Sequence, residues 1–397
     1  MAVVGGGLAG LAASLELVDR GHDVVLHEAR PTLGGAVQTL PEREGDPPPP
    51  PDNGQHIALG CFTAYRRFLD RIGKADALRR EPLRLPVIDE RGRIATIGPG
   101  LRLLGYAHLS LRSRVRIARD ALRQRGLTPA AVAERTYAEV LNASADEIDR
   151  FWDVFIRPAL NLPTREAGAD YGVFTVQTAF FGGRGASDLL LPLEPLGKMH
   201  GEAAGRALGE RVRLESRVER LDDLDADAIV VAAPPQEAAR LLGREPPALG
   251  DSPIVSVHLL FDRRLLRHRL AALLDSPAHW VFDRGALTGH EPPEGQYLTV
   301  VSSGAPELLE VRGKALVDTM ADALRERLGD ADLLWSRVSR EPRATFAARP
   351  GTRNLRWPML TSRPNVLLAG AWTASDWPAT MEAAVRSGVR AAEALSR

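Results

Sequence analysis

The glycine pattern in the first ten residues restricts the fold more than any other feature of the chain. A short apolar stretch, residues 2–4, runs directly into G-x-G-x-x-G, and residues 8–18 then show the apolar spacing of a helix. In such a turn the first glycine permits the sharp bend, the second lets the backbone approach a pyrophosphate, and the third allows the helix to pack closely on the strand. The free N–H groups at the start of the helix favour an anion there. This pattern predicts a dinucleotide-binding α/β unit whose contact residues are Gly5, Gly7, Leu8, Ala9 and Gly10.

A second strand and an acidic residue follow in the expected order. Residues 23–29 are apolar enough for a strand, and Glu28 comes 18 residues after Gly10, where a carboxylate can accept a hydrogen bond from a ribose 2′-hydroxyl. An ordinary glycine-rich turn is the alternative interpretation. Strand, helix, second strand and acid in register favour the nucleotide site.

A second glycine pair stands just after this acid. The run from Glu28 to Gly35 resembles the extended fingerprint of the amine-oxidase and phytoene-desaturase superfamily of FAD enzymes. The resemblance implies that the pair passes close to the pyrophosphate and ribityl part of FAD. Many members carry Arg after the pair, whereas this chain has Ala36, so that phosphate contact is missing or comes from elsewhere, for example from Arg30. The implied contact residues are Glu28, Ala29, Arg30, Gly34 and Gly35, together with Val218 from the strand-like stretch 211–235.

The C-terminal segment agrees with a flavin site. Residues 365–370 read as a strand, a loop rich in Trp follows, and a helix is expected over Met381–Leu395 with Thr380 as its cap. The N-terminus of that helix, aimed at a flavin, would stabilise negative charge on the reduced ring. Ala383, Ala384 and Gly388 are small, as close packing against the first helix requires, although an ordinary amphipathic helix is the alternative. The predicted contact residues are Gly370, Trp372, Thr380, Met381 and Glu382.

The pieces of the predicted cofactor site are scattered along the chain. We therefore predict an α/β fold with a discontinuous Rossmann-like FAD-binding domain over residues 1–58, 195–245 and 350–397. An α+β substrate-binding domain, as in the amine oxidases, is expected over 59–194 and 246–349. Ser110 is expected to cap a helix that ends at Gly126. Capping boxes are expected at Thr136/Glu139 and at Ser144/Glu147, and an exposed loop is expected over Pro47–Pro51.

Several longer motifs narrow the resemblance. They are "DNGQHIALGC" at 52–61, "FW" at 151–152, "PALNLP" at 158–163, "FFGGRGASDLLLP" at 180–192 and "AGAWTASDWPATMEAAVRSG" at 369–388. In order from end to end, they are similar to the hydroxysqualene dehydroxylase family, the squalene-associated FAD enzymes of bacterial hopanoid pathways. The resemblance implies conversion of hydroxysqualene to squalene, and hence a hydrophobic isoprenoid substrate. Two alternatives stay open. One is another desaturase or amine oxidase of the superfamily, and the other is a non-enzymatic, FAD-stabilised partner or chaperone of a prenyl-condensing enzyme. Amine oxidases often place a Lys beside the flavin, and this chain has three Lys.

Replacing an allylic hydroxyl by hydrogen requires an acid that assists loss of water, and then a hydride. The candidate acids are Asp52, His56 and Asp188. For Asp52 and His56 the alternative is a hydrogen-bonded structural turn. Asp188 could instead cap its own segment.

Composition and missing motifs exclude other classes of function. Lys+Arg and Asp+Glu are both 51, which gives no support to a nucleic-acid partner. Cys61 is the single cysteine, so a disulfide is excluded within the chain and non-covalent FAD is expected. No metal motif and no second dinucleotide motif is visible, so we expect no metal and a separate electron donor. No signal peptide or spanning segment is evident, which predicts a cytoplasmic protein, either free or peripheral on the inner membrane. Residues 101–119 mix Leu with Arg and could lie on a bilayer, or form a core helix with a solvated basic face.

Overall fold

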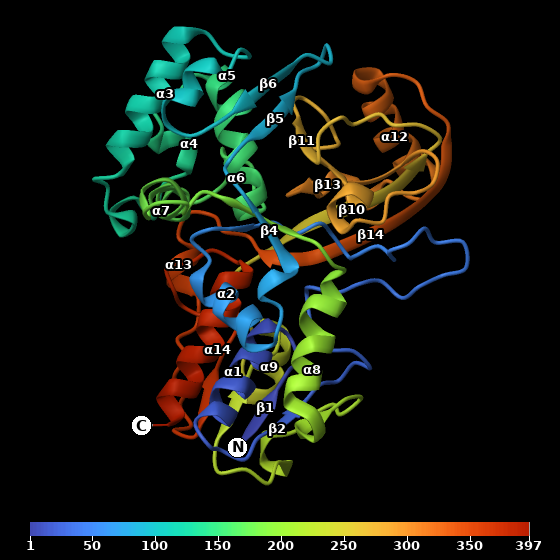
Figure 1. The fold of residues 1–397 in the computed structure, drawn as a ribbon. Coiled ribbons are helices and arrows are strands. Elements are labelled where there is room, and N and C mark those ends of the chain that lie inside the picture. Colours follow the sequence, from blue (N-terminus) through green and yellow to red (C-terminus); the bar gives the residue numbers. More distant parts are fainter. Residues whose placement is uncertain (397) are drawn as a thin grey trace.

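A parallel sheet near both chain ends forms the core of one lobe in the computed structural model, which describes residues 1–396 (Figure 1). The strand order is β15 (Val366–Leu368), β9 (Ile229–Val231), β1 (Ala2–Val4), β2 (Val25–His27) and β8 (Val212–Arg213). All neighbours in this sheet are parallel. Its strands come from three distant parts of the chain, so the predicted α/β fold is confirmed.

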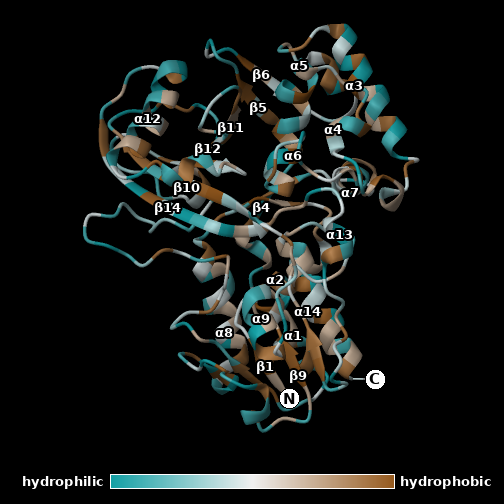
Figure 2. Cartoon of the chain, turned by 180° about the vertical axis from the view of Figure 1, so that it is seen from behind, coloured by the Kyte–Doolittle hydropathy of each residue, from teal (hydrophilic) through white to brown (hydrophobic). Residues whose placement is uncertain are grey.

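Helices cover both faces of this sheet, as parallel sheets require. They are α1 (Leu8–Asp19), α8 (Ala203–Leu208), α9 (Pro235–Leu242) and α14 (Met381–Leu395). In Figure 2 the inner strands β1 and β9 are brown, the hydrophobic end of the scale. Helix α14 packs on α1 so closely that a Cβ at Gly388 would lie 2.0 Å from the carbonyl oxygen of Ala9. The expectation that small residues permit this contact is therefore confirmed.

The second lobe contains a mixed seven-stranded sheet. Its order is β14 (Leu333–Phe346), β10 (Asp251–Phe261), β13 (Gln296–Ser303), β12 (Trp280–Asp283), β11 (Leu270–Leu273), β5 (Leu85–Ile88) and β6 (Ile94–Ile97). Only β11 and β5 run parallel; the other neighbours are antiparallel. Every residue of β13 is buried, as expected for a central strand. Helices α10 (Arg284–Thr288), α11 (Glu307–Glu310) and α12 (Lys314–Leu328) follow or precede these strands.

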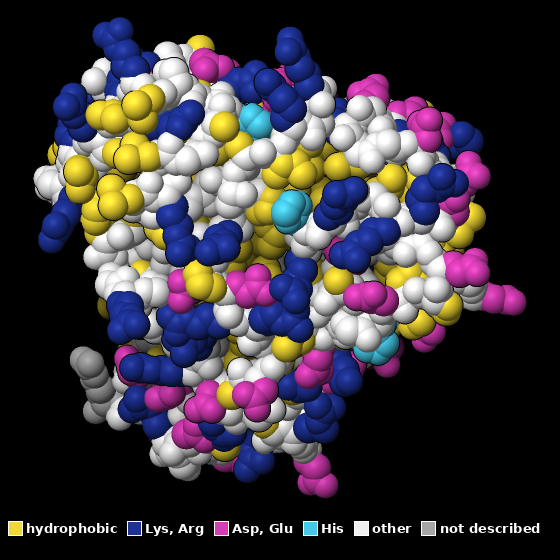
Figure 3. Space-filling view, turned by 45° about the horizontal axis from the view of Figure 1, so that its top comes forward, with side chains coloured by type: hydrophobic (Ala, Val, Ile, Leu, Met, Phe, Trp, Pro, Cys, Tyr) yellow, Lys and Arg dark blue, Asp and Glu magenta, His cyan; other side chains and the backbone are white. Residues whose placement is uncertain are grey.

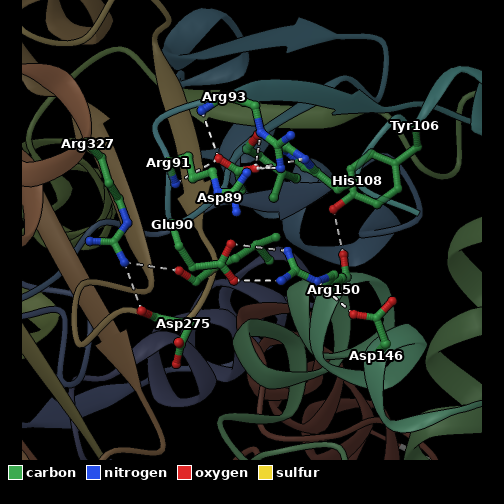
Figure 4. Close-up of polar contacts among 12 residues, drawn as sticks. Asp89, Glu90, Arg91, Arg93, Tyr106, His108, Asp146, Arg150, Asp275 and Arg327 are labelled. Carbon is green, nitrogen blue, oxygen red and sulfur yellow. Dashed lines mark hydrogen bonds and ion pairs between the residues drawn. The ribbon is translucent and has the colours of Figure 1, made fainter. Parts of the chain in front are cut away.

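A helical layer lies beside this sheet at the top of Figure 1. It contains the 3-10 helix η2 (Gly100–Gly105) and the helices α3 (Leu111–Gln124), α4 (Tyr137–Val140), α5 (Ala145–Glu147), α6 (Asp153–Leu160) and α7 (Ala169–Phe181). The cap at Ser110 and both predicted capping boxes are present. Figure 4 shows how the β5–β6 turn is tied to this layer: Arg150 pairs with Glu90 and with Asp146, each at 2.8 Å.

A small antiparallel sheet joins the two lobes. Its strands are β3 (Ala58–Leu59), β7 (Leu189–Pro192) and β4 (Leu78–Glu81). Helix α2 (Thr63–Arg71) packs against α14, and the predicted domain boundary at residue 58 stays a prediction. Helix α13 (Thr352–Leu355) leads back to the first lobe.

Two expectations on local structure were wrong in part. The Pro47–Pro51 loop is not wholly exposed: Pro49 and Pro51 are buried, because the chain turns back and Leu40 N–H donates to the Pro51 carbonyl at 2.8 Å. The stretch 211–235 contains two short strands, β8 and β9, but the first of them is only two residues long, since Glu215 takes a positive φ of 51° and ends the extended backbone. Within residues 1–396 no helix has both the length and the apolar character to cross a membrane.

Candidate functional site

The loop between β1 and α1 has the geometry that the glycine pattern predicts. Gly5 has φ +109°, and a Cβ at Gly10 would lie 1.8 Å from the Gly5 carbonyl oxygen, so both positions require glycine. Gly7 differs, because a Cβ there would meet only the Cα of Gly35, at 3.7 Å. No side chain caps α1 and no acid stands in its first turn, so no side chain of the protein takes the place of an anion at the first N–H groups of this helix.

Glu28 joins this loop to the segment that follows β2. Its carboxylate accepts from the N–H of Gly6 at 2.7 Å and from that of Arg30 at 2.8 Å. Gly34 N–H donates to the Gly6 carbonyl at 2.8 Å, and a Cβ at Gly35 would lie 2.8 Å from the Cα of Gly7. The two glycine segments thus meet backbone to backbone. The side chains of Ala29 and Arg30 are exposed at the rim.

Val218 lies close to the same place. The Ser216 N–H donates to the Glu28 carbonyl at 2.9 Å, and Val218 follows two residues later with 8% exposure. Its own carbonyl accepts from Arg240 at 2.7 Å. An apolar side chain here can contact the adenine end of a dinucleotide that lies along Glu28. This contact stays a prediction.

The C-terminal helix starts where it was expected. Thr380 caps α14 by accepting from Ala383 N–H at 3.2 Å, and Met381 is the first helical residue. Two other predicted contact residues use their side chains for the fold. Trp372 donates to the Ala233 carbonyl at 3.0 Å. The buried Glu382 accepts from the N–H groups at the start of α2, at 3.0 and 2.8 Å. Trp372 and Glu382 therefore have mainly their backbone atoms free to contact a cofactor.

Sequence reasoning missed Arg356, which organises the loop before α14. This side chain is 4% exposed and lies inside the turn of residues 370–377. Gly370, the first residue of that turn, has φ +148°. The guanidinium donates to five backbone carbonyls, those of Ala371, Trp372, Thr373, Ser375 and Trp377, at 2.6–3.3 Å. No local pattern marks this arginine, because all its partners lie at least 15 residues away.

The first candidate acid, Asp52, is part of a buried ion pair. Its Oδ2 lies 2.7 Å from Arg284 Nη1, and its Oδ1 accepts from Thr39 Oγ1 at 2.7 Å and from Leu196 N–H at 2.9 Å. Asp52 is 2% exposed and Arg284 1%. A carboxylate held by three protein donors is suited to fixing the turn rather than to giving a proton.

His56, four residues on, is freer. Its Nδ1 lies 3.1 Å from the Gly54 carbonyl and so donates to it, which leaves Nε2 as the titrating atom. Burial lowers the pKa of His56, while the Gly54 carbonyl and the carboxylates of Asp52 and Glu341 oppose that shift. Glu341 is a second residue that the sequence did not indicate. The turn lies beside the glycine pair, since Asn53 donates to the Ala36 carbonyl at 2.8 Å.

Asp188 is not brought together with that turn. Its backbone carbonyl accepts from Gly60 N–H at 2.8 Å, and its side chain has no hydrogen bond to Asp52 or His56. Its carboxylate pairs with Arg80 at 2.8 Å on the partly exposed side of the small sheet. The three candidate acids therefore do not form one cluster.

A cluster of three aromatic side chains lies just before the N-terminus of α14. The half-buried Trp377 meets Phe62 and Phe174 edge to face, with ring centroids 5.7 and 5.2 Å apart. Such rings provide an apolar wall, and a cation already lies over one of them: the Arg386 guanidinium is 5.2 Å from the centroid of the Trp377 ring. In the described part of the chain, residues 1–396, no three His, Cys, Asp or Glu side chains are arranged to hold a metal.

These residues fit the pyrophosphate and ribose of FAD, because the open side of Gly7 and the uncapped α1 leave room and donors for it. Comparison with known proteins agrees. Residues 8–396 match the family model of flavin-containing amine oxidoreductases. Hydroxysqualene dehydroxylases of Sinorhizobium fredii and Rhodopseudomonas palustris are 26% and 28% identical, each covering 98% of this chain and 97% of the relative. The resemblance found in the motifs is thereby confirmed. A zeta-carotene desaturase of Synechocystis is 24% identical over the whole chain and 96% of the relative.

Solved structures share the fold. An oxidoreductase from Methanosarcina mazei superposes with a TM-score of 0.76 at 18% identity, covering 98% of each chain. A putrescine oxidase superposes with a TM-score of 0.72 at 17% identity, covering 99% of this chain and 98% of the other. The amine-oxidase-like fold is therefore confirmed. The chain belongs to the flavin-containing amine oxidoreductase family and is an FAD-dependent oxidoreductase.

Proposed function

We propose that this enzyme removes the hydroxyl group of hydroxysqualene reductively, giving squalene. The observation that carries the proposal is the match of both dehydroxylases over 98% of the chain, which includes the Asp52–His56 turn beside the glycine pair. The substrate is then a long hydrophobic isoprenoid alcohol. The half-buried ring of Trp377 and its neighbours would form part of the wall that receives it.

His56 is the residue that we assign as the proton donor. Protonated at Nε2, it gives that proton to the allylic hydroxyl, which leaves as water. Its Nδ1–H bond to Gly54 fixes the ring, and the buried Asp52–Arg284 pair fixes the turn that carries it. Aromatic side chains and exclusion of water stabilise the carbon centre that loses the hydroxyl. When bound, reduced FAD supplies the hydride that replaces the hydroxyl, so the two electrons come from the cofactor.

The bound flavin is expected to be non-covalent and reduced by a separate donor. Burial raises the pKa of the Cys61 thiol to about 12, which disfavours the thiolate that a cysteinyl bond would require. Heat or acid should release all flavin from the precipitated chain. In stopped flow, NADPH alone should bleach the flavin slowly, and fast bleaching without an added reductase would contradict a separate donor.

The test is single turnover under anaerobic conditions. Photoreduced enzyme mixed with hydroxysqualene should give squalene and reoxidised flavin, whereas oxidised enzyme should give neither. His56→Gln should slow this step by about 10²–10⁴-fold with flavin content unchanged. Because burial lowers the pKa of His56, its protonated fraction and the rate should rise as pH falls from 8 to 6. Asp188→Asn is the matched control and should keep the rate within about two-fold.

One rival function has an observation in its favour, namely the match to a carotene desaturase. A desaturase would work in the opposite direction, so oxidised enzyme would be bleached by a polyene. A bleached flavin with zeta-carotene, together with no squalene from reduced enzyme, would replace the dehydroxylase proposal. Reduced enzyme that binds hydroxysqualene without turnover would indicate a protein that only binds the isoprenoid.

A further inference from the structure

Exposed apolar side chains gather at one end of the helical layer. Nine large apolar residues are exposed in the part of the chain that the structure describes, and five of them lie between residues 94 and 122. They are Ile94 at 47%, Leu101 at 85%, Leu104 at 38%, Leu111 at 61% and Leu122 at 61%. We call this surface, formed by β6, η2 and α3, the α3 face. Single exposed leucines are ordinary, but a group of them on adjoining elements marks an interaction surface.

Apolar residues recur at helical spacing along the outward side of α3. At 100° per residue, one outward stripe about 40° wide is formed by Leu111, Val115 and Leu122. The opposite side, which packs on the protein, contains Ile117 together with the polar Asp120 and Gln124. A surface helix of a protein surrounded only by water would show the reverse arrangement, with leucines inward and polar groups outward.

Arginines border this stripe. Residues 101–125 contain seven Arg and a single acid, Asp120, in a chain whose total charges balance at 51 and 51. Asp120 is buried and pairs with Arg123 at 2.6 Å. Arg112 and Arg119 have no hydrogen bond or ion pair to any described residue, and both are exposed. Together with Leu111 and Val115 they line a surface groove of about 620 Å³ along the helix.

The space-filling view shows the same arrangement. In Figure 3, hydrophobic side chains gather at the upper left of the molecule, where the helical layer lies, and dark blue Lys and Arg side chains surround them. In Figure 1 this region is at the opposite end of the molecule from both labelled chain ends.

We propose that the α3 face lies on the surface of a bilayer that contains anionic phospholipid. The leucines enter the boundary between headgroups and acyl chains, and the arginines reach the lipid phosphates while their stems stay in the apolar layer. Anionic lipid is the occupant that matches both features of the surface, the excess of positive charge and the group of exposed leucines. This interaction goes beyond the proposed reaction and does not depend on the identity of the substrate.

Flotation of the FAD-loaded protein with lipid vesicles tests the proposal. Vesicles of phosphatidylcholine with about one quarter phosphatidylglycerol should carry the protein upward, and pure phosphatidylcholine or 0.5 M salt should largely abolish this, because exposed charges are screened within a few ångströms at high salt. The variant Arg112→Gln/Arg119→Gln should bind about 20- to 30-fold more weakly, since each Arg near an anionic surface contributes roughly a five-fold preference. Leu111→Ser/Leu122→Ser should lose a similar factor.

Matched controls lie elsewhere on the chain. Leu334 and Leu360 are 59% and 65% exposed, and Arg312 and Arg390 are exposed without a charged partner among the described residues. Leu334→Ser/Leu360→Ser and Arg312→Gln/Arg390→Gln should bind vesicles as the parent does. Flavin content and melting temperature of all four variants should be unchanged.

Three results would overturn the proposal. They are no flotation of the parent protein, equal loss in the control variants, and binding to pure phosphatidylcholine that salt does not weaken. If light scattering shows oligomers that the Leu111→Ser/Leu122→Ser variant dissolves, and vesicles are not bound, the α3 face is a protein interface instead. A protein that does not float with vesicles can still convert hydroxysqualene to squalene, so a failure of the membrane proposal can be distinguished from a failure of the proposed reaction.

Discussion

Replacing Arg356 by Met should collapse the loop that leads into α14 and remove the flavin. The guanidinium is buried, donates to five loop carbonyls and also contacts Tyr171 Oη at 3.3 Å. Burial lowers the pKa of this guanidinium, while Tyr171 and Asp170 oppose that shift. Methionine keeps an apolar stem in place of that of arginine but supplies no donor.

The magnitude follows from the carbonyls left without a donor. A buried acceptor that loses its partner costs about 1–3 kcal/mol. Of the five carbonyl residues, Trp372 and Thr373 are buried. The other three, Ala371, Ser375 and Trp377, are partly exposed and can turn their carbonyls toward water. We expect a loss of about 4–6 kcal/mol in unfolding free energy, which is a large share of the roughly 5–15 kcal/mol of a typical domain. Arg356→Lys, with three donors in place of five, should lose about half as much.

Urea unfolding followed by circular dichroism, together with the ratio of flavin to protein, measures both effects. The matched control is Arg363→Met, which removes an exposed ion pair with Asp222 at 2.7 Å and should cost at most about 1 kcal/mol with full flavin. An Arg356→Met protein with normal flavin content and less than about 1 kcal/mol of destabilisation would refute the assignment of Arg356 as the organiser of this loop.

Three further outcomes are expected. Gly7→Val should abolish flavin binding yet leave the apoprotein folded, because a Cβ there meets only the Cα of Gly35, at 3.7 Å. Gly10→Val should instead prevent folding. Retained flavin in Gly7→Val would exclude the glycine loop as the pyrophosphate site. Arg284→Met should lower the unfolding free energy by about 3–5 kcal/mol by leaving the Asp52 charge buried and unpaired, and a loss below 1 kcal/mol in urea unfolding would show that water reaches the site. Burial lowers the pKa of His200 to about 3, so its contribution to the unfolding free energy is present above pH 6.5 and is lost as pH falls. Between pH 7 and 5 the unfolding free energy of the parent should therefore fall by roughly 2 kcal/mol more than that of His200→Gln. Equal losses in the two proteins would contradict the lowered pKa.

The sequence alone determined the elements whose physics is local. The turn at Gly5 to Gly10, the acid at Glu28 and the helix Met381–Leu395 with its Thr380 cap were all predictable. Each depends on residues within a few positions of one another: glycines that permit a φ, side chains that cap the next turn, apolar spacing that fits one period. The family resemblance followed from the same local motifs.

Only the tertiary structure decided which polar groups are available for chemistry. Asp52 and Arg284 are 232 positions apart and Glu382 lies 317 positions from the α2 backbone that it binds, so no local pattern could show that these carboxylates are already used. The outward direction of the leucines on α3 likewise depends on which side of the helix packs on the rest of the protein. Periodicity predicts an apolar stripe on a helix, but it does not determine whether protein or solvent covers that stripe. Partners brought together by folding decide whether a charged or apolar side chain is structural or free to act.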